Sequence, residues 1–390
     1  RGRFLAAARH AGPAARVVAD SPFRGAAPMP RHPSLLPLFL LLAGAASVAG
    51  PIAAAEPPTR VYRNELMRLE RPAPLLADHP DFFEPIVEVT RYEAPVLVDD
   101  EGADLDVRAW RFSYNARGIV EIPNRLRGRD TALIVVHPWG IDDGQGWVTP
   151  EPAGVADFCT KEKNALAGRH TREVLAPFVA ALRPRVGCVV YSLPGVRDPV
   201  RRALYRSFDH VPSAEERREG RERLAAVLGA FDYSGGPLPA EFEVARDRPV
   251  RDYLRHFPGL DSGDAFDPPG FWKLPIPVTA DLEVDPADVV AYDDEGYPRL
   301  RDFLAAQGIR HVLLAGYAAD MCYCRTTAGY ENLSRDFDVF LVGDASLATF
   351  PANASPRHAT NAAISKAALD QLVTQISWVR PRPRGAAAAP

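Results

Sequence analysis

The stretch from Arg310 to Arg325, RHVLLAGYAADMCYCR, limits the possible folds more than any other part of the chain. Its apolar run, His311 to Ala315, ends at Gly316, which is typical of a buried central strand in a parallel sheet. A sharp turn should follow, and Asp320 is a good N-cap for a helix. We therefore expect Cys322 in the first turn of a helix that directly follows a buried strand.

A cysteine in the first turn of a helix is chemically activated. Free backbone N–H groups and the positive end of the helix dipole favour a thiolate over a thiol. The same kind of N–H group can bind an oxyanion. The candidate donors are the backbone groups of the predicted turn, namely Tyr317, Ala318, Asp320 and Met321.

The chain has four cysteines, so disulfide formation, metal binding and core packing are alternatives to a nucleophile. Two residues apart in a helix, Cys322 and Cys324 would diverge by about 200°, which argues against a disulfide between them. Cys188 lies within a predicted strand and is interpreted as a core residue. The sequence leaves the disulfide state of Cys159, Cys188 and Cys324 open.

The segment GYAADMC, with DVFLVGDAS after it, resembles the isochorismatase-like cysteine hydrolases, a family that includes nicotinamidases and N-carbamoyl amide hydrolases. Gly316 and Cys322 match the nucleophile motif, with Ala319 where threonine is usual, and Asp344 matches the next strand. The resemblance covers roughly residues 130 to 378. It implies an α/β fold, a doubly wound and mostly parallel sheet in three α/β/α layers, with the site at the carboxyl ends of the strands and no cofactor.

The first core strand, TALIVVH from Thr131 to His137, carries a departure from that family. The family has an aspartate at the end of this strand, as the general base; here the position holds His137. A histidine could accept the proton of Cys322, because its reference pKa is near neutrality. Asp142 or Asp143, in the loop that follows, could instead supply a carboxylate.

The family's third catalytic residue is a lysine, and the equivalent region, Val284 to Glu295, has none. Lys273 could reach the site from the preceding insertion, and Asp293 could lie at a strand end facing it. Further side chains are candidate pocket walls: Trp139, Trp272 and Tyr292. A cluster of nitrogen and oxygen ligands for a divalent metal could form from His137, Asp142, Asp143, Asp293 and Asp294. The spacing of these residues matches no metal-binding motif. We therefore predict no metal.

Residues 29–55 have the composition of a secretory signal peptide. Met29 is followed by a basic residue, an apolar core from Leu35 to Ala49 and the small residues Ala53 to Ala55 before Glu56. We therefore expect residues 1–28 to be a non-native upstream extension and the mature chain to begin near Glu56. The predicted localisation is periplasmic or secreted, without a membrane anchor after the signal is removed.

The charge balance narrows the possible partners. The formal net charge is −4, and removal of residues 1–55, which hold six Arg and one Asp, makes it more negative. Such a surface is a poor match for nucleic acid or anionic lipid. The expected partner is a small-molecule substrate, and a homo-oligomer is possible.

The remaining chain divides by composition. Residues 56–128 are predicted to be an extended lead-in and a small β extension with a hairpin turn at Asn115 to Gly118. Residues 129–380 form the predicted catalytic domain, with a crossover helix after Thr160 and an insertion, 194–288, that could be a lid or subunit contact. The insertion carries a helix with a capping box, Ser213 to Gly229. A final helix is expected from Pro356 to Trp378, and a disordered tail over 381–390.

Three functions are compatible with these features. The first is an exported hydrolase that attacks a C–N bond of a small amide through Cys322. The second is a pseudoenzyme that keeps the pocket for ligand binding or assembly, because two positions that are catalytic in the family have changed. The third is redox or metal chemistry at Cys322 and Cys324.

Overall fold

A computed structural model describes residues 59–146, 148, 161–230, 241, 243–250, 274–348 and 375–381. The chain divides into the units Arg1–Arg60 and Val61–Pro390, and every described helix and strand lies in the second. The strands are β1 (Met67–Leu69), β2 (Arg91–Glu93), β3 (Leu105–Ser113), β4 (Gly118–Leu126), β5 (Thr131–Val136), β6 (Cys188–Leu193), β7 (Val289–Tyr292), β8 (His311–Tyr317), β9 (Asp338–Leu347) and β10 (Gln375–Pro381). The helices are η1 (Gly128–Asp130), α1 (Lys161–His170), η2 (Thr171–Leu175), α2 (Ala176–Leu182), α3 (Pro199–Leu204), α4 (Ala214–Gly229), η4 (Ala280–Leu282), η5 (Asp293–Glu295), α6 (Tyr297–Ala306), α7 (Cys322–Arg325) and α8 (Tyr330–Leu333).

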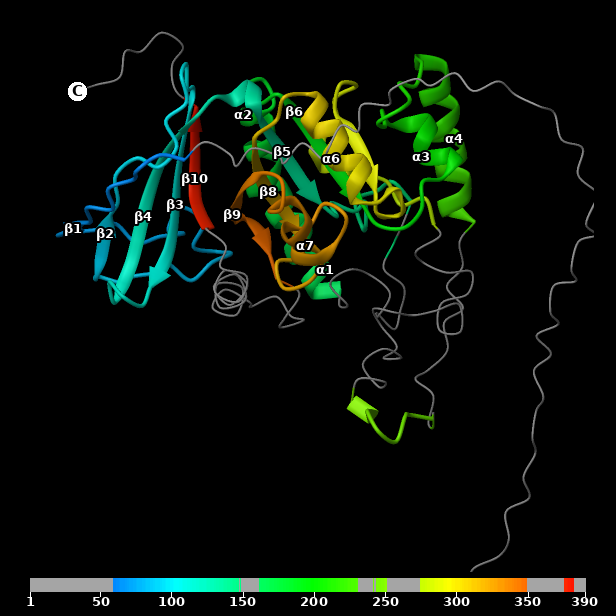
Figure 1. The fold of residues 1–390 in the computed structure, drawn as a ribbon. Coiled ribbons are helices and arrows are strands. Elements are labelled where there is room, and N and C mark those ends of the chain that lie inside the picture. Colours follow the sequence, from blue (N-terminus) through cyan, green and yellow to red (C-terminus); the bar gives the residue numbers. More distant parts are fainter. Residues whose placement is uncertain are drawn as a thin grey trace, which may run out of the picture. The chain divides into compact units, whose positions relative to one another are not determined.

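The described strands form one sheet in the order β1-β2-β4-β3-β10-β9-β8-β5-β6-β7 (Figure 1). From β10 to β7 all neighbours are parallel. The predicted α/β class with a mostly parallel, doubly wound sheet is confirmed.

Strand β5 is buried on both faces, which explains its unbroken apolar sequence. Leu133 and Val135 belong to one hydrophobic cluster, together with the inner residues of α1 and α2. Ile134 belongs to a second cluster on the opposite face, with Leu300 and Leu304 of α6. Helices therefore cover both faces, as the predicted three layers require, and each such buried side chain contributes about 1.5–3 kcal/mol.

The predicted crossover helix forms, but in three parts. An α-helix, α1, passes into the π-helix η2 and then into α2. Pro177, near the start of α2, has no N–H to donate to the carbonyl four residues before it, which favours a wider turn at this point. The capping box at the start of α4 is also confirmed, because Ser213 and Glu216 exchange hydrogen bonds of 3.1 and 2.7 Å.

The β extension continues the sheet of the core. The predicted turn before Gly118 is present, and β3 and β4 form a hairpin. Strand β3 also pairs antiparallel with β10, whose other neighbour is β9 of the core. Between β1 and β2, Ile86 forms an isolated bridge with Leu75.

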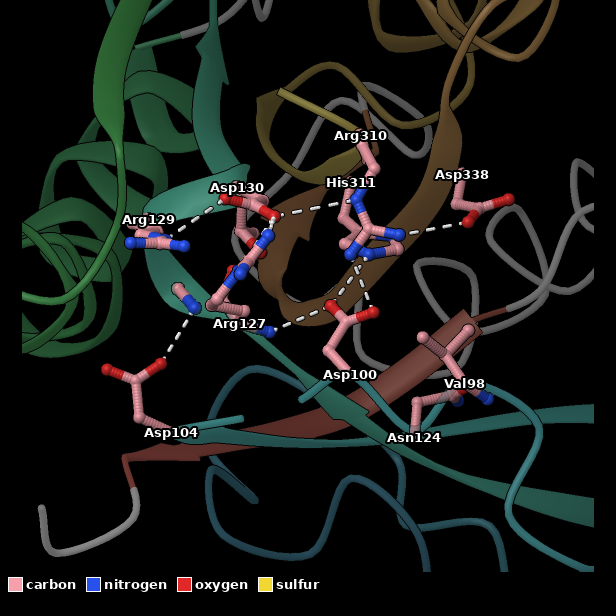
Figure 2. A network of polar contacts seen from close by, with 12 residues as sticks. Val98, Asp100, Asp104, Asn124, Arg127, Arg129, Asp130, Arg310, His311 and Asp338 are labelled. Atoms are coloured by element: carbon pink, nitrogen blue, oxygen red, sulfur yellow. Dashed lines mark hydrogen bonds and ion pairs between the residues drawn. The ribbon is translucent and has the colours of Figure 1, made fainter. Parts of the chain in front are cut away.

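A polar network links this extension to the amino ends of the core strands (Figure 2). The carboxylate of Asp100 accepts hydrogen bonds from the backbone N–H of Arg127 at 3.0 Å and from Arg310 Nη2 at 2.6 Å. It also lies 3.1 Å from His311 Nε2, while His311 Nδ1 lies 3.2 Å from Asp338. The network is at the end of β8 opposite the one that leads to Cys322.

The prediction for the C-terminal segment was wrong where it can be compared. Residues 375–378 were expected to end a helix, yet they belong to β10, which runs on to Pro381. Hydrogen bonding to β3 and β9 on both sides outweighs the local helical pattern. The rest of that helix, 356–374, and the predicted tail beyond 381 lie outside the described residues. Within the described ranges, no helix has the length and apolar character needed to span a membrane.

Candidate active site

The strand order brings three predicted site residues to one edge of the sheet. From β5 the chain proceeds to β6 and β7 on one side, whereas β8 and β9 lie on the other. Ligand sites in open α/β sheets lie at such a reversal, beyond the carboxyl ends of the strands. His137 directly follows β5, Asp293 directly follows β7, and Cys322 comes five residues after the end of β8.

His137 is held in one orientation. Its side chain is 2% exposed, and its Nε2 lies 3.2 Å from Oδ2 of Asp293. Its backbone N–H donates to the carbonyl of Ser192 at 2.8 Å, and its ring stacks on Trp139 with 5.8 Å between centroids. The backbone φ of His137 is +45°, a conformation that costs a non-glycine residue about 1–3 kcal/mol and is found mainly at functional sites.

The pKa of His137 reflects its two neighbours. Burial lowers this pKa, but Asp293 and the thiol of Cys322 outweigh burial and raise it to about 10. His137 Nδ1 makes no hydrogen bond of standard geometry to any described residue, so the effect of Cys322 is that of a looser contact. The imidazole is therefore protonated at neutral pH, beside a sulfur and a carboxylate.

Cys322 is half-buried and is not in a disulfide, and the same holds for Cys188 and Cys324. Cys159 lies outside the described residues. Cys322 is the first residue of α7, as predicted, but this helix has only four residues and Met321, not Asp320, is its N-cap. The chain first makes a turn in which the N–H of Met321 donates to the carbonyl of Ala318 at 3.0 Å, so the helix begins later than expected.

Two of the backbone groups near this turn are already used. The N–H of Met321 is bonded to Ala318, and that of Ala319 donates to the carbonyl of Leu347 at 2.8 Å. Among the described residues, the N–H of Cys322 has no hydrogen-bond partner. This group is therefore available to a ligand, whereas the predicted role of Met321 as an oxyanion donor is not supported.

Asp293 is fixed to the loop that follows the cysteine. Its backbone carbonyl accepts a hydrogen bond of 2.8 Å from the hydroxyl of Thr327. Its neighbour Asp294 points elsewhere and accepts the backbone N–H of Arg197 at 3.1 Å. Only the first of these two adjacent carboxylates therefore takes part in the site.

Beside His137 there is a cavity of about 330 Å³, which is also lined by Asp142 and Asp143. Asp143 is occupied within the loop, because it accepts hydrogen bonds from Gln145 at 2.8 Å and from the N–H of Ala280 at 3.0 Å. Asp142 is exposed. The carboxylate that meets His137 is thus that of Asp293.

The candidate pocket walls lie in different places. Trp139 lines the cavity, and so does the side chain of Tyr317, whose backbone group alone was a candidate in the sequence. Tyr292 does not, because it is 1% exposed in the core, with the guanidinium of Arg201 stacked 4.9 Å from its ring centroid. Trp272 and Lys273 lie outside the described residues.

A buried lysine that the sequence did not reveal lies beside the nucleophile turn. Lys163, in the first turn of α1, has 0% exposure. Burial lowers the pKa of Lys163 to about 8, and the carboxylate of Asp320 opposes that shift. Asp320 therefore interacts electrostatically with α1 instead of capping a helix. A lysine at the start of a helix usually projects into solvent, so its local sequence carried no signal of burial.

Five residues at this edge carry nitrogen or oxygen atoms that can bind a metal ion. In the described part of the chain, no three or more His, Cys, Asp or Glu side chains are arranged to hold a metal ion. The five separate into the pair of His137 and Asp293, the loop residues Asp142 and Asp143, and Asp294, which caps Arg197.

Fold and site together define an α/β protein with a cysteine, a histidine and an aspartate at the carboxyl edge of a parallel sheet. No protein-family model matches the sequence, and no curated protein matches it.

The comparison with solved structures gave matches that include the following three proteins. A cysteine hydrolase from Pseudomonas syringae pv. phaseolicola 1448A is 16% identical over 57% of this chain and 75% of its own, with a TM-score of 0.29. An isochorismatase family protein from Desulfovibrio vulgaris is 16% identical over 63% of this chain and 93% of its own, with a TM-score of 0.32. The nicotinamidase PncA from Bacillus subtilis is 13% identical over 63% and 98%, with a TM-score of 0.28.

Proposed function

We propose that this protein is a cysteine hydrolase of the isochorismatase-like kind, which cleaves a C–N bond of a small amide through a thioacyl intermediate on Cys322. The observation that carries the proposal is the 3.2 Å pair of His137 and Asp293 beside the Cys322 thiol. A nucleophile, a base and a group that orients the base are the parts that covalent acyl transfer needs.

The arrangement also accounts for the departures from the family that the sequence resembles. There, the resemblance implies an acid after the first core strand and a lysine before the nucleophile strand. Here, the first position holds His137, and Asp293 follows β7 in the region where the lysine would stand. The two strand ends still present one acidic and one basic group, with their positions exchanged, so proton transfer remains possible.

In the proposed reaction, His137 holds the proton of the Cys322 thiol, and the resulting thiolate forms a bond to the amide carbon. The negative oxygen of the tetrahedral intermediate would be stabilised by the free N–H of Cys322. The C–N bond then breaks as His137 gives its proton to the leaving amine. Water adds to the thioacyl carbon and loses a proton to His137, and the C–S bond breaks to release the acid.

The cavity sets the scale of the substrate. Its volume of about 330 Å³ suits a small molecule, and both polar and aromatic side chains line it. Export through residues 29–55 is part of the proposal, and so is the possibility of a homo-oligomer. Nucleic acid and membrane surfaces are not expected partners, given the acidic net charge.

Iodoacetamide labelling, followed by mass spectrometry, tests the proposal without a known substrate. We expect rapid, pH-dependent alkylation of Cys322 in the wild type, much slower alkylation in D293N, and wild-type behaviour in D294N, whose carboxylate points away from the site. A panel of small primary amides and N-carbamoyl compounds, assayed by ammonia release, should then give turnover that C322A abolishes. Sluggish labelling of the wild type would instead favour a ligand-binding pseudoenzyme.

A further inference from the structure

Tyr317 is held by a buried chain of hydrogen bonds that the proposed reaction does not use. Its hydroxyl lies 2.8 Å from Nδ1 of His170 and 2.7 Å from Oγ1 of Thr171. The other ring nitrogen, His170 Nε2, lies 2.9 Å from the backbone carbonyl of Asp344 in β9. His170 and Thr171 occupy the junction between α1 and the π-helix η2, so the chain joins this helix to β8 and β9.

The direction of both hydrogen bonds of His170 can be assigned. His170 is 0% exposed, and burial lowers its pKa to about 3, although the carbonyl of Asp344 opposes that shift. The imidazole is therefore neutral and carries one proton. A carbonyl can only accept, so that proton is on Nε2, and Nδ1 must accept from the hydroxyl of Tyr317. Tyr317 has then given its only proton, and the single hydroxyl proton of Thr171 is shared between the Tyr317 oxygen at 2.7 Å and the carbonyl of Ala167 at 2.9 Å.

This assignment limits what Tyr317 can do. Although it lines the cavity beside His137, its hydroxyl proton is committed to His170. The ring can therefore form a wall of the cavity but cannot act as a proton donor to a substrate. Tyr317 is also the last residue of β8, five residues before Cys322, so its position determines where the nucleophile turn starts.

Two phenylalanines from the segment between β1 and β2 pack against the same histidine. The rings of Phe82 and Phe83 pack edge-on against His170, at centroid distances of 5.2 and 5.8 Å. Both phenylalanines are buried in the main hydrophobic cluster. The segment between β1 and β2 thus helps to enclose the histidine that bonds Tyr317.

We infer that His170 is a positioning residue of the site, which fixes Tyr317 and through it the distance between Cys322 and His137. The inference rests on the proposed function, because it concerns the same cysteine. An electrostatic interaction weakens as its partners separate, so loss of these hydrogen bonds weakens the contact by which Cys322 raises the pKa of His137.

The test is the pH dependence of Cys322 alkylation by iodoacetamide in the full chain. In H170F and Y317F we expect the midpoint of the profile to rise by about one pH unit, which is a tenfold change in the thiolate equilibrium. T171V, which keeps the side-chain volume and removes the hydroxyl, should shift it in the same direction, whereas T171S should restore the wild-type profile.

H311F is a matched control for a loss of folding stability that does not act on the site. His311 is a buried histidine of the same strand, 1% exposed, but at the opposite end and bonded to Asp100. H311F should lower the thermal unfolding midpoint and leave the alkylation profile unchanged. If H170F does not fold, the comparison of T171V with T171S still decides the question.

Two failures can be told apart. Slow labelling of the wild-type cysteine would remove the proposed hydrolase. Rapid wild-type labelling with an unshifted profile in T171V and Y317F would overturn the positioning role of His170 and leave the hydrolase standing.

Discussion

His137 and Asp293 are 156 positions apart in the sequence, and their side chains meet with 3.2 Å between Nε2 and Oδ2. Each residue directly follows a strand, and these strands, β5 and β7, are separated in the sheet by β6. The pair places a charged imidazole in a buried position next to a thiol.

The first prediction concerns the pH dependence of stability at this pair. The pKa of folded His137, about 10, is above the ordinary value of 6.5. Its interaction with Asp293 therefore stabilises the fold fully below pH 6.5, and this stabilisation is lost as the pH rises through 10. In urea denaturation at about pH 6, D293N should be less stable than the wild type by about 1–3 kcal/mol, and the difference should shrink toward about pH 10.

The variant D294N is the control, because Asp294 accepts a backbone hydrogen bond near the surface and does not contact His137. Its effect should be smaller and should not change over the same pH range. A D293N deficit that stays constant over this range would contradict the assignment of a raised pKa to His137.

The second prediction concerns the network of Figure 2. Burial raises the pKa of Asp100, but the N–H of Arg127 and the charges of Arg310 and His311 outweigh burial and lower it below 3.8. Asp100 therefore stabilises the fold above pH 3.8, and this contribution is lost as the pH falls through its lowered pKa. D100N should lose about 1–3 kcal/mol at neutral pH, measured by chemical denaturation.

The adjacent Asp99 is a suitable control for Asp100. Its side chain is 59% exposed, in a 3.5 Å ion pair with Arg125, so D99N should change the stability by less than about 1 kcal/mol. Equal losses in the two variants would show that burial and bonding of Asp100 do not matter to the junction between the extension and the core.

The third prediction concerns Gly316, near the end of β8. Its φ is +107°, and a Cβ atom there would lie 2.3 Å from the carbonyl oxygen of Val136 in the neighbouring strand. G316A should therefore combine backbone strain with a clash and destabilise by more than about 3 kcal/mol in thermal or urea unfolding. It should also displace the turn that carries Cys322 and reduce iodoacetamide labelling.

Gly308 separates the two causes. Its φ is +73°, but a methyl group added there would meet no atom within 4 Å, so G308A should lose only about 1–2 kcal/mol. If G316A were destabilised no more than G308A, the clash with Val136 in the neighbouring strand would not contribute to the loss of stability.

The sequence alone determined the central strands and the position of the cysteine. An apolar run such as TALIVV is typical of a strand covered on both faces, and β5 is buried in that way. Gly316 also indicated a sharp turn after this strand, because its positive φ is a conformation that disfavours other residues. Local signals such as the capping box at Ser213 were sufficient for helix starts that depend on a few adjacent residues.

Only the tertiary structure decided which side chains meet. Asp142, Asp143 and Asp293 were all candidate carboxylates of the site in the sequence, and the order of β5, β6 and β7 places Asp293 against His137. Burial of His170 beside Tyr317 likewise depends on packing between elements far apart in the chain. Propensity and periodicity report on a residue's own helix or strand, whereas hydrogen bonds between elements depend on how the whole sheet is ordered, and that order is a property of the complete fold.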